Sequence, residues 1–204
     1  MGAVVAIDAL LQPQRVWRGR PAAPPAGAQP TGHAGLDAVL PSGGWPEAAL
    51  SELLIPADGV GELQLLWPTL ARLSQAGERI VLVAPPYLPF APAWRQAGVD
   101  LSRLQVVRAG ASRDALWATE QCLRSGSCGA VLCWPLDADD RALRRLQVAA
   151  ASGRTLAFAT RPLATAVHPS PAALRIAIDA APAQWRVLKC RGGAAPAQPV
   201  PRAG

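Results

Sequence analysis

The sequence predicts an α/β protein whose mainly parallel sheet is covered by helices on both faces. Short apolar runs rich in β-branched residues alternate with segments whose apolar residues recur at helical spacing. A helix between two strands returns the chain to the same edge of the sheet, so this alternation builds parallel strands. The last two apolar runs are joined by a short proline-containing connection, which predicts a closing antiparallel hairpin.

Seven segments are predicted to be strands. The first five alternate with helical segments: Leu50–Ile55, Ile80–Ala84, Leu104–Val107, Ala130–Trp134 and Thr155–Ala159. The last two form the predicted hairpin: Leu174–Ile178 and Trp185–Cys190.

Three of the intervening segments carry an apolar stripe on one helical face. The stripes are Leu63, Leu66, Leu70 and Leu73; Leu116, Thr119 and Leu123; and Leu143, Leu146 and Ala150. Glycines follow helical segments at Gly77, Gly98, Gly126 and Gly153. We expect these glycines at the left-handed position that ends a helix.

These elements are predicted to form one domain, residues 31–190. Residues 1–30 hold an apolar patch, Val4–Leu11, and then a basic, proline-rich stretch that favours an extended linker. Residues 191–204 are rich in Gly, Ala and Pro and are predicted to be a disordered tail. The chain shows neither a signal-peptide pattern nor the ~20 consecutive apolar residues of a membrane span, so we expect a cytoplasmic protein without membrane contact.

Charge and cysteine usage narrow the classes of partner. The formal net charge is +6 and Lys189 is the single lysine, so the remaining cations are arginines. Guanidinium groups pair bidentately with phosphate and carboxylate, which favours an acidic or phosphate-bearing partner, although a GC-rich coding bias also raises arginine content. The four cysteines form no C-x-x-C pair, and the two histidines lie in loop-like sequence. We therefore expect buried thiols, no metal site and no cofactor.

The segment that follows the first strand has the strand–loop–helix context of a P-loop, G-x-x-x-x-G-K-[ST]. Aligning the second glycine with Gly61 puts Pro56 at the first glycine, Glu62 at the lysine and Leu63 at the hydroxyl. The lysine would neutralise phosphates and the hydroxyl would bind Mg²⁺, so both functions are lost. At a helix N-terminus, Glu62 supplies the negative charge that a phosphate supplies elsewhere. Gly59 and Gly61 also suit an ordinary tight turn.

The sequence around this loop resembles the RecA core. Thr31–Leu40 (TGHAGLDAVL) and Gly43–Pro46 (GGWP) are similar to the stretch and turn that precede the P-loop strand of RecA, and Gly98–Leu104 (GVDLSRL) to a later segment. Trp134 stands at or beside the place of the Mg²⁺-site aspartate of RecA, and Pro85-Pro86 where RecA has its water-activating glutamate. The resemblance thus implies that four catalytic features are lost together, as in a pseudo-enzyme.

Over about four-fifths of its length the chain resembles the ImuA family, RecA/SulA-like accessory proteins of bacterial SOS mutagenesis cassettes. The similar stretches are Thr31–Leu54, Gly59–Leu73, Val81–Leu104, Asp114–Pro135, Leu143–Ala149 and Leu188–Gly193. The resemblance implies a non-catalytic role in error-prone translesion DNA synthesis, with RecA, ImuB and a DnaE-type polymerase as partners. It implies no catalytic residues, because the family is described as lacking those of the nucleotide site.

Two other functions stay open. A SulA-like cell-division inhibitor would share the ancestry of the fold and bind a tubulin-like polymer. An active RecA-like NTPase is the third interpretation, which Glu62 and Leu63 disfavour.

The N-terminal segment supplies the first candidate interface. Its candidate partner-binding residues are Ile7, Leu10, Leu11, Trp17, Arg18 and Arg20. Trp17 has arginines on both sides and no apolar periodicity, and Trp and Arg are typical anchors of interfaces. Alternatively, Trp17 packs back onto its own domain. For the tryptophans of helices and strands we expect burial in the core.

Basic residues supply the second candidate interface, with DNA or an acidic partner. They are Arg141, Arg144, Arg145, Arg161, Lys189 and Arg191. The first three lie opposite the apolar stripe of the helix that starts near Asp139, and Arg161 follows a strand at the edge where parallel sheets place ligands. DNA contact through such residues would be weak and independent of sequence. Alternatively, the row is only a solvated helix face.

Overall fold

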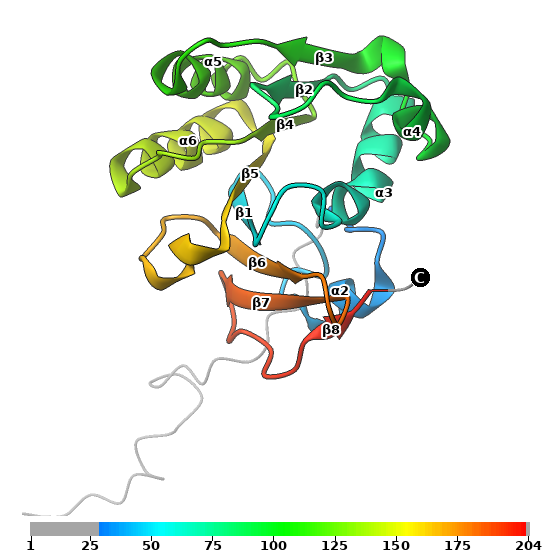
Figure 1. Cartoon of the computed structure of the whole chain (residues 1–204), viewed down its shortest axis with the longest axis vertical. Helices are drawn as coiled ribbons and strands as arrows, with labels where there is room; N and C mark the ends of the chain where they lie inside the picture. Colours follow the sequence, from blue (N-terminus) through cyan, green and yellow to red (C-terminus); the bar gives the residue numbers. More distant parts are fainter. Residues whose placement is uncertain (1–28, 203–204) are drawn as a thin grey trace, which may run out of the picture.

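The computed structural model describes residues 29–202 and shows a mixed α/β fold around one eight-stranded sheet (Figure 1). The strands are β1 (Leu50–Ile55), β2 (Ile80–Val83), β3 (Leu104–Val107), β4 (Ala130–Cys133), β5 (Leu156–Pro162), β6 (Leu174–Asp179), β7 (Gln184–Cys190) and β8 (Val200–Pro201). The helices are α2 (Ala34–Val39), α3 (Glu62–Gln75), α4 (Ala91–Gln96), α5 (Ser112–Arg124) and α6 (Asp140–Gly153), with the short 3-10 helices η1 (Leu101–Arg103) and η2 (Leu163–Val167).

The sheet runs in the order β3-β2-β4-β5-β1-β6-β7-β8. All neighbours from β3 to β6 pair in parallel, whereas β7 pairs antiparallel with β6 and β8 with β7. The predicted parallel sheet and closing hairpin are therefore confirmed, and all seven predicted strands are present with small shifts at their ends. The RecA-like character of the core stays a prediction.

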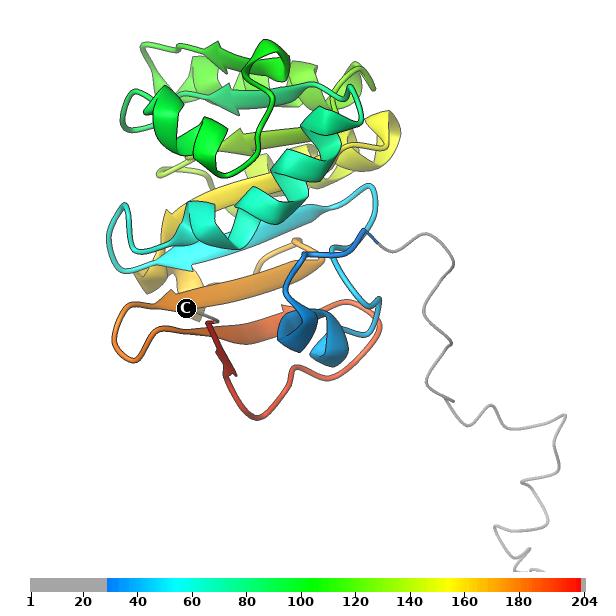
Figure 2. The ribbon, with the colours of Figure 1, turned by 90° about the vertical axis from the view of Figure 1, so that its right-hand side faces the viewer.

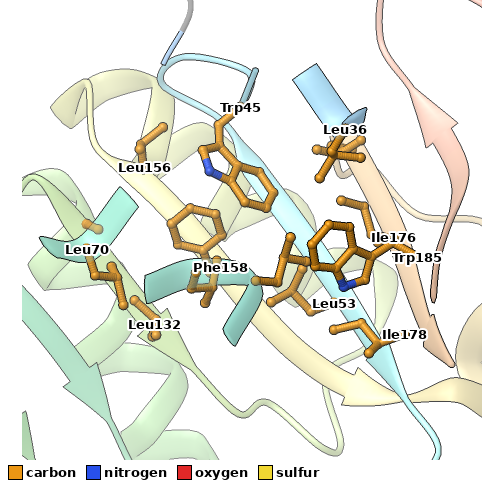
Figure 3. Close-up of a cluster of buried hydrophobic side chains, with 14 of the residues drawn as sticks. Leu36, Trp45, Leu53, Leu70, Leu132, Leu156, Phe158, Ile176, Ile178 and Trp185 are labelled. Carbon is orange, nitrogen blue, oxygen red and sulfur yellow. The ribbon is translucent and has the colours of Figure 1, made fainter. Parts of the chain in front are cut away.

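Helices cover both faces of the sheet. α3 and α4 lie on one face and α5 and α6 on the other (Figures 1 and 2). Because successive side chains of a strand point to opposite faces, β1 contributes Leu53 and Ile55 to one core and Leu50 to the other. Figure 3 shows the first core, in which Trp45 meets Phe158 edge to face with ring centroids 4.9 Å apart. Among the described residues, no helix has the length and hydropathy that a membrane crossing requires.

The contact between α5 and α6 depends on the absence of a side chain at Gly153. A Cβ there would collide with the carbonyl oxygen of Leu123. The expectation that Gly153 takes the left-handed position is wrong, because Arg154 does so, with φ 53°. Gly77, Gly98 and Gly126 do adopt positive φ after their helices, as expected.

Two further expectations are corrected. Trp45, Trp94 and Trp185 are buried, but Trp117 is 61% exposed because α5 buries a different face. The segment after residue 190 is not disordered as far as it is described, since Val200 pairs with Trp185 and is itself buried. A strand of two residues has no periodicity, so this pairing leaves no signal in the sequence.

Candidate partner-binding site

The site begins at the loop between β1 and α3. Gly61 adopts a left-handed conformation, with φ 105°, and this lets the chain turn from the loop into the helix. Directly after it, Glu62 is buried and its Oε1 accepts a hydrogen bond from the backbone N–H of Gly59 at 3.0 Å. A carboxylate of the chain itself thus lies at a helix N-terminus, where an anion is favoured, in line with the expectation from the sequence.

The C-terminal segment closes the outside of the same loop. The guanidinium of Arg202 donates from Nη1 to the carbonyl oxygen of Val60 at 2.6 Å. It lies against Gly61 so closely that a Cβ at this glycine would displace it. The loop is therefore held by one carboxylate and one guanidinium from its own chain.

The positions at which the RecA resemblance predicts lost catalytic groups line one cavity. This cavity of about 160 Å³ is lined by residues that follow three different strands. They are Glu62, Leu63, Pro85, Pro86 and Trp134. The other lining residues are Trp67, Leu82, Tyr87, Leu88, Pro89, Phe90, Ala93 and Trp94. Cavities that take drug-sized ligands and cofactors usually measure about 300–1,000 Å³. This one is small and apolar, which suits inserted side chains better than a nucleotide.

The rim of the cavity exposes large apolar side chains. Tyr87, Leu88 and Phe90, in the connection between β2 and α4, are 71%, 75% and 70% exposed. Leu136, in the connection after β4, is 59% exposed and lines a neighbouring pocket that shares Trp134 with this cavity. Prolines at 85, 86 and 89 fix backbone φ angles around the first three. Apolar side chains gathered on a stiff loop are characteristic of protein–protein interfaces. We call the cavity and these four residues the apolar edge site.

Two residues that line the cavity carry buried indole N–H groups without an acceptor. Nε1 of Trp67 and Nε1 of Trp134 find no acceptor within residues 29–202, and Oε2 of Glu62 finds no donor there. A buried donor without an acceptor costs about 1–3 kcal/mol. The lining is therefore not fully satisfied within the described part of the chain.

Arg161 is not part of an exposed basic surface, which corrects the expectation from the sequence. It is 8% exposed, and its Nη1 donates to Oε1 of Glu52 at 2.7 Å. Arg175 donates from Nε to the other oxygen of Glu52, also at 2.7 Å. The register places these residues on the neighbouring strands β5, β1 and β6. Arg161 is thus part of a buried ion triad with Glu52 and Arg175.

Both arginines also hold connections at the carboxyl edge. Arg161 Nη2 donates to the carbonyl oxygen of Ala138 at 2.7 Å. The guanidinium of Arg175 donates to the carbonyl oxygens of Thr165, Ala166 and His168, at and just after η2. The buried ion triad therefore holds the connection after β4, which carries Leu136, and the connection after β5, which contains η2.

The arginines of α6 are largely engaged within the protein. Arg144 pairs with Asp140 at 2.9 Å, and Arg145 pairs with Glu120 of α5. Within the described chain, Arg141 makes no ion pair. Lys189 and Arg191 are exposed, but they lie near the first residue of β6, at the opposite edge from the start of α6. The candidate basic residues therefore do not form one surface.

The surroundings of three cysteines disfavour the thiolate form. Burial raises the pKa of Cys133 to about 12 and also raises the pKa of Cys122 and of Cys190. Cys128, Cys133 and Cys190 are buried and Cys122 is half-buried, as expected. A thiol with a raised pKa is a weak nucleophile at neutral pH, so Cys122, Cys133 and Cys190 are poorly suited to covalent chemistry.

The sequence identified the degenerate loop but missed most of the apolar edge site. Tyr87, Leu88, Phe90 and Trp67 were not predicted as site residues, although an aromatic run between prolines directly follows the carboxyl end of a strand. Ligands usually bind at that edge of a parallel sheet, so the aromatic run after the strand could have predicted the site. The N-terminal candidates lie outside the described residues and stay a prediction: Ile7, Leu10, Leu11, Trp17, Arg18 and Arg20.

Comparison with known proteins adds two similarities. A family model described as the cell division inhibitor SulA matches residues 48–157, more than half of the chain. The crystal structure of SulA from Pseudomonas aeruginosa is 30% identical, covers 57% of this chain and 99% of that chain, and superposes with a TM-score of 0.48. No curated protein matches the chain. The segment matched by the family model includes every residue of the apolar edge site.

Proposed function

The chain belongs to the family of the cell division inhibitor SulA, and we propose that it acts by binding a protein partner at the apolar edge site, without nucleotide chemistry. One observation carries this proposal. Four positions at which the RecA resemblance predicts lost catalytic groups line the same small apolar cavity. Apolar and aromatic side chains there would desolvate well against a partner, whereas they offer nothing to a triphosphate or to Mg²⁺.

The partner that we propose is RecA or the ImuB–DnaE-type polymerase assembly of error-prone translesion synthesis. The support comes from stretches similar to the ImuA family that lie outside the SulA match. Residues 31–47 include α2, and residues 188–193 include the end of β7. The segment matched by the SulA model includes neither stretch, so both support a partner other than a division protein.

A second candidate is a division inhibitor that binds a tubulin-like polymer. The family match supports this function more directly than it supports translesion synthesis, because division inhibition is what the description of the family states. Both candidates use a non-catalytic protein surface and differ in the partner. The choice between them is therefore a question of binding specificity.

A binding panel with the full chain separates the candidates. The immobilised protein is presented, one at a time, with RecA filaments, ImuB, the DnaE-type polymerase and a tubulin-like division GTPase. Selective capture of RecA, ImuB or the polymerase is expected, together with cells that divide normally on expression. Capture of the division GTPase with filamentation of the cells would replace the first candidate by the second. Capture of none of the four would contradict both.

A further inference from the structure

The cavity of the apolar edge site has a lining that selects its ligand. The lining is aliphatic and aromatic apart from Glu62 and the hydroxyl of Tyr87. Large apolar side chains at its rim are exposed. A fitting occupant therefore offers apolar side chains that are small enough for a cavity of about 160 Å³.

We propose that residues 4–11 of the same chain dock into this cavity. The segment reads Val-Val-Ala-Ile-Asp-Ala-Leu-Leu, and it is the apolar stretch of the chain outside the described part. On a helix, Ile7, Leu10 and Leu11 would share one face, because Leu10 and Leu11 follow Ile7 by three and four residues.

The connecting chain is long enough for this return. The described chain starts at Gln29, which accepts a hydrogen bond from Arg72 near the end of α3, whereas the cavity lies at Glu62, the first residue of the same helix. Figure 2 shows these two ends of α3 at opposite edges of the sheet. At a rise of 1.5 Å per residue, α3 spans about 20 Å. A proline-rich connection over residues 12–28 spans up to about 50 Å.

Docking within one chain has an advantage over docking between two copies. A tethered segment meets its site at an effective concentration on the order of millimolar, so a weak contact is enough to keep the site covered. Burial of large apolar side chains on both partners supplies the driving force. The segment then covers Tyr87, Leu88 and Phe90, which are exposed otherwise.

Whether docking of residues 4–11 affects partner binding rests on the proposed function. If a partner binds at the apolar edge site, residues 4–11 compete with it, and the segment acts as an internal inhibitor. The docking itself requires no partner. Its test is therefore independent of whether the proposed function holds.

Photo-crosslinking in the full chain tests the docking. A benzoylphenylalanine replaces Leu88, and in a matched control it replaces Val148, an exposed apolar residue of α6 on the other face of the sheet. Isotopically light and heavy protein are mixed before irradiation, so that mass spectrometry separates crosslinks within a chain from those between chains. The experiment is repeated with Leu10→Asp, and with Gln12→Asp, which adds the same charge outside the apolar patch.

The expected result is a crosslink from position 88 to residues 4–11 of the same chain. Leu10→Asp should reduce it at least fivefold, Gln12→Asp should leave it unchanged, and position 148 should give none. Crosslinks found mainly between light and heavy chains would assign the site to a second copy and overturn docking within the chain. Absence of residues 4–11 from the crosslinked products would overturn the proposal altogether.

The partner captured in the binding panel provides the second readout. If residues 4–11 cover the site, Leu10→Asp should tighten partner binding about tenfold relative to Gln12→Asp. A loss of binding in Leu10→Asp would instead make the segment a direct partner contact and overturn its inhibitory role, whatever the crosslinks show.

Discussion

Glu52 is a fully buried carboxylate in the middle of the sheet, and it neutralises one of two buried guanidinium groups. Its hydrogen-bond partners lie 109 and 123 residues away along the sequence. Such separations explain why the sequence did not reveal the triad. A strand predicted from its apolar residues gives no information on which strands will be its neighbours, and Arg161 was therefore interpreted as a surface residue.

Removing the charge of Glu52 should destabilise the fold strongly. Glu52→Gln leaves two buried guanidinium groups without a counter-charge, and breaking a buried ion pair typically costs about 3–5 kcal/mol. Urea unfolding followed by circular dichroism measures the change. Glu47→Gln is the control, because Glu47 is exposed, and it should change the free energy of unfolding by less than about 0.5 kcal/mol. Equal free energies of unfolding in the two variants would show that the ion triad does not stabilise the fold.

At residue level the sequence predicts a degenerate nucleotide loop, and this stays a prediction. Its basis is the alignment with a P-loop, which puts Glu62 and Leu63 where that motif has a lysine and a hydroxyl. The structure adds the bond from Gly59 to Glu62 and the contact of Arg202 with the loop. The second contact was not predictable, because it depends on the fold of the C-terminal segment.

Nucleotide should leave the stability of the protein unchanged. A ligand stabilises a protein only if it binds the native state, and the apolar edge site offers no phosphate ligand in place of lysine and hydroxyl. Thermal unfolding with and without millimolar Mg-ATP measures this directly. We expect equal melting temperatures and no ATP hydrolysis, with or without DNA. A reproducible rise of several degrees in the melting temperature with Mg-ATP would show nucleotide binding and support the NTPase interpretation.

At the scale of elements, helices and strands were predictable because apolar periodicity and turn residues specify them locally. The ends of the chain were not, since β8 is stabilised by its pairing with β7 and by burial of Val200. The β6–β7 hairpin was predicted as an element. Its ion pair, Asp179 with Arg186 at 2.8 Å, depends on the register that the two strands adopt.

The hairpin should give a pH-dependent contribution to stability. The hydrogen bonds from Arg186 lower the pKa of Asp179 below its ordinary value of 3.8. A lowered folded-state pKa means stability that is present above the unfolded-state pKa and lost as pH falls through the folded-state pKa. Asp179→Asn should therefore cost about 0.5–1 kcal/mol at pH 7, since Arg186 is partly exposed, and almost nothing near pH 2. A cost that does not change between pH 7 and pH 2 would show that the charge is irrelevant.

Helix α6 should contact DNA phosphate first through Arg141. Arg144 and Arg145 form ion pairs with carboxylates, whereas Arg141 makes none within the described chain. If α6 binds DNA, Arg141→Ala should lower the slope of log affinity against log salt by about 0.9, and Arg144→Ala should lower it less. Fluorescence anisotropy with a labelled duplex over a salt series measures both. An unchanged slope in Arg141→Ala would show that α6 does not contact DNA and that its arginines form only a solvated face.

The whole molecule combines a conventional α/β scaffold with an apolar carboxyl edge that is partly exposed. Parallel sheets gather the ends of distant strands at one edge, so residues far apart in sequence line one cavity there. The sequence predicted the scaffold, which is confirmed, and a loss of catalytic groups, which stays a prediction. It did not predict the exposed side chains of Tyr87, Leu88 and Phe90, because their exposure follows from how the connection after β2 folds.

The most direct test of this account is the affinity of the chain for the partner that the binding panel identifies. The double variant Leu88→Asp, Phe90→Asp places charge in the apolar edge site, and Val148→Asp is the matched control on α6. Loss of two anchor residues should weaken binding by at least 2–3 kcal/mol, on the order of 100-fold, with equal values in the presence and absence of Mg-ATP. The control should bind like the unmodified chain. Unchanged affinity in the double variant, or affinity that depends on ATP, would contradict a nucleotide-independent docking site at this edge.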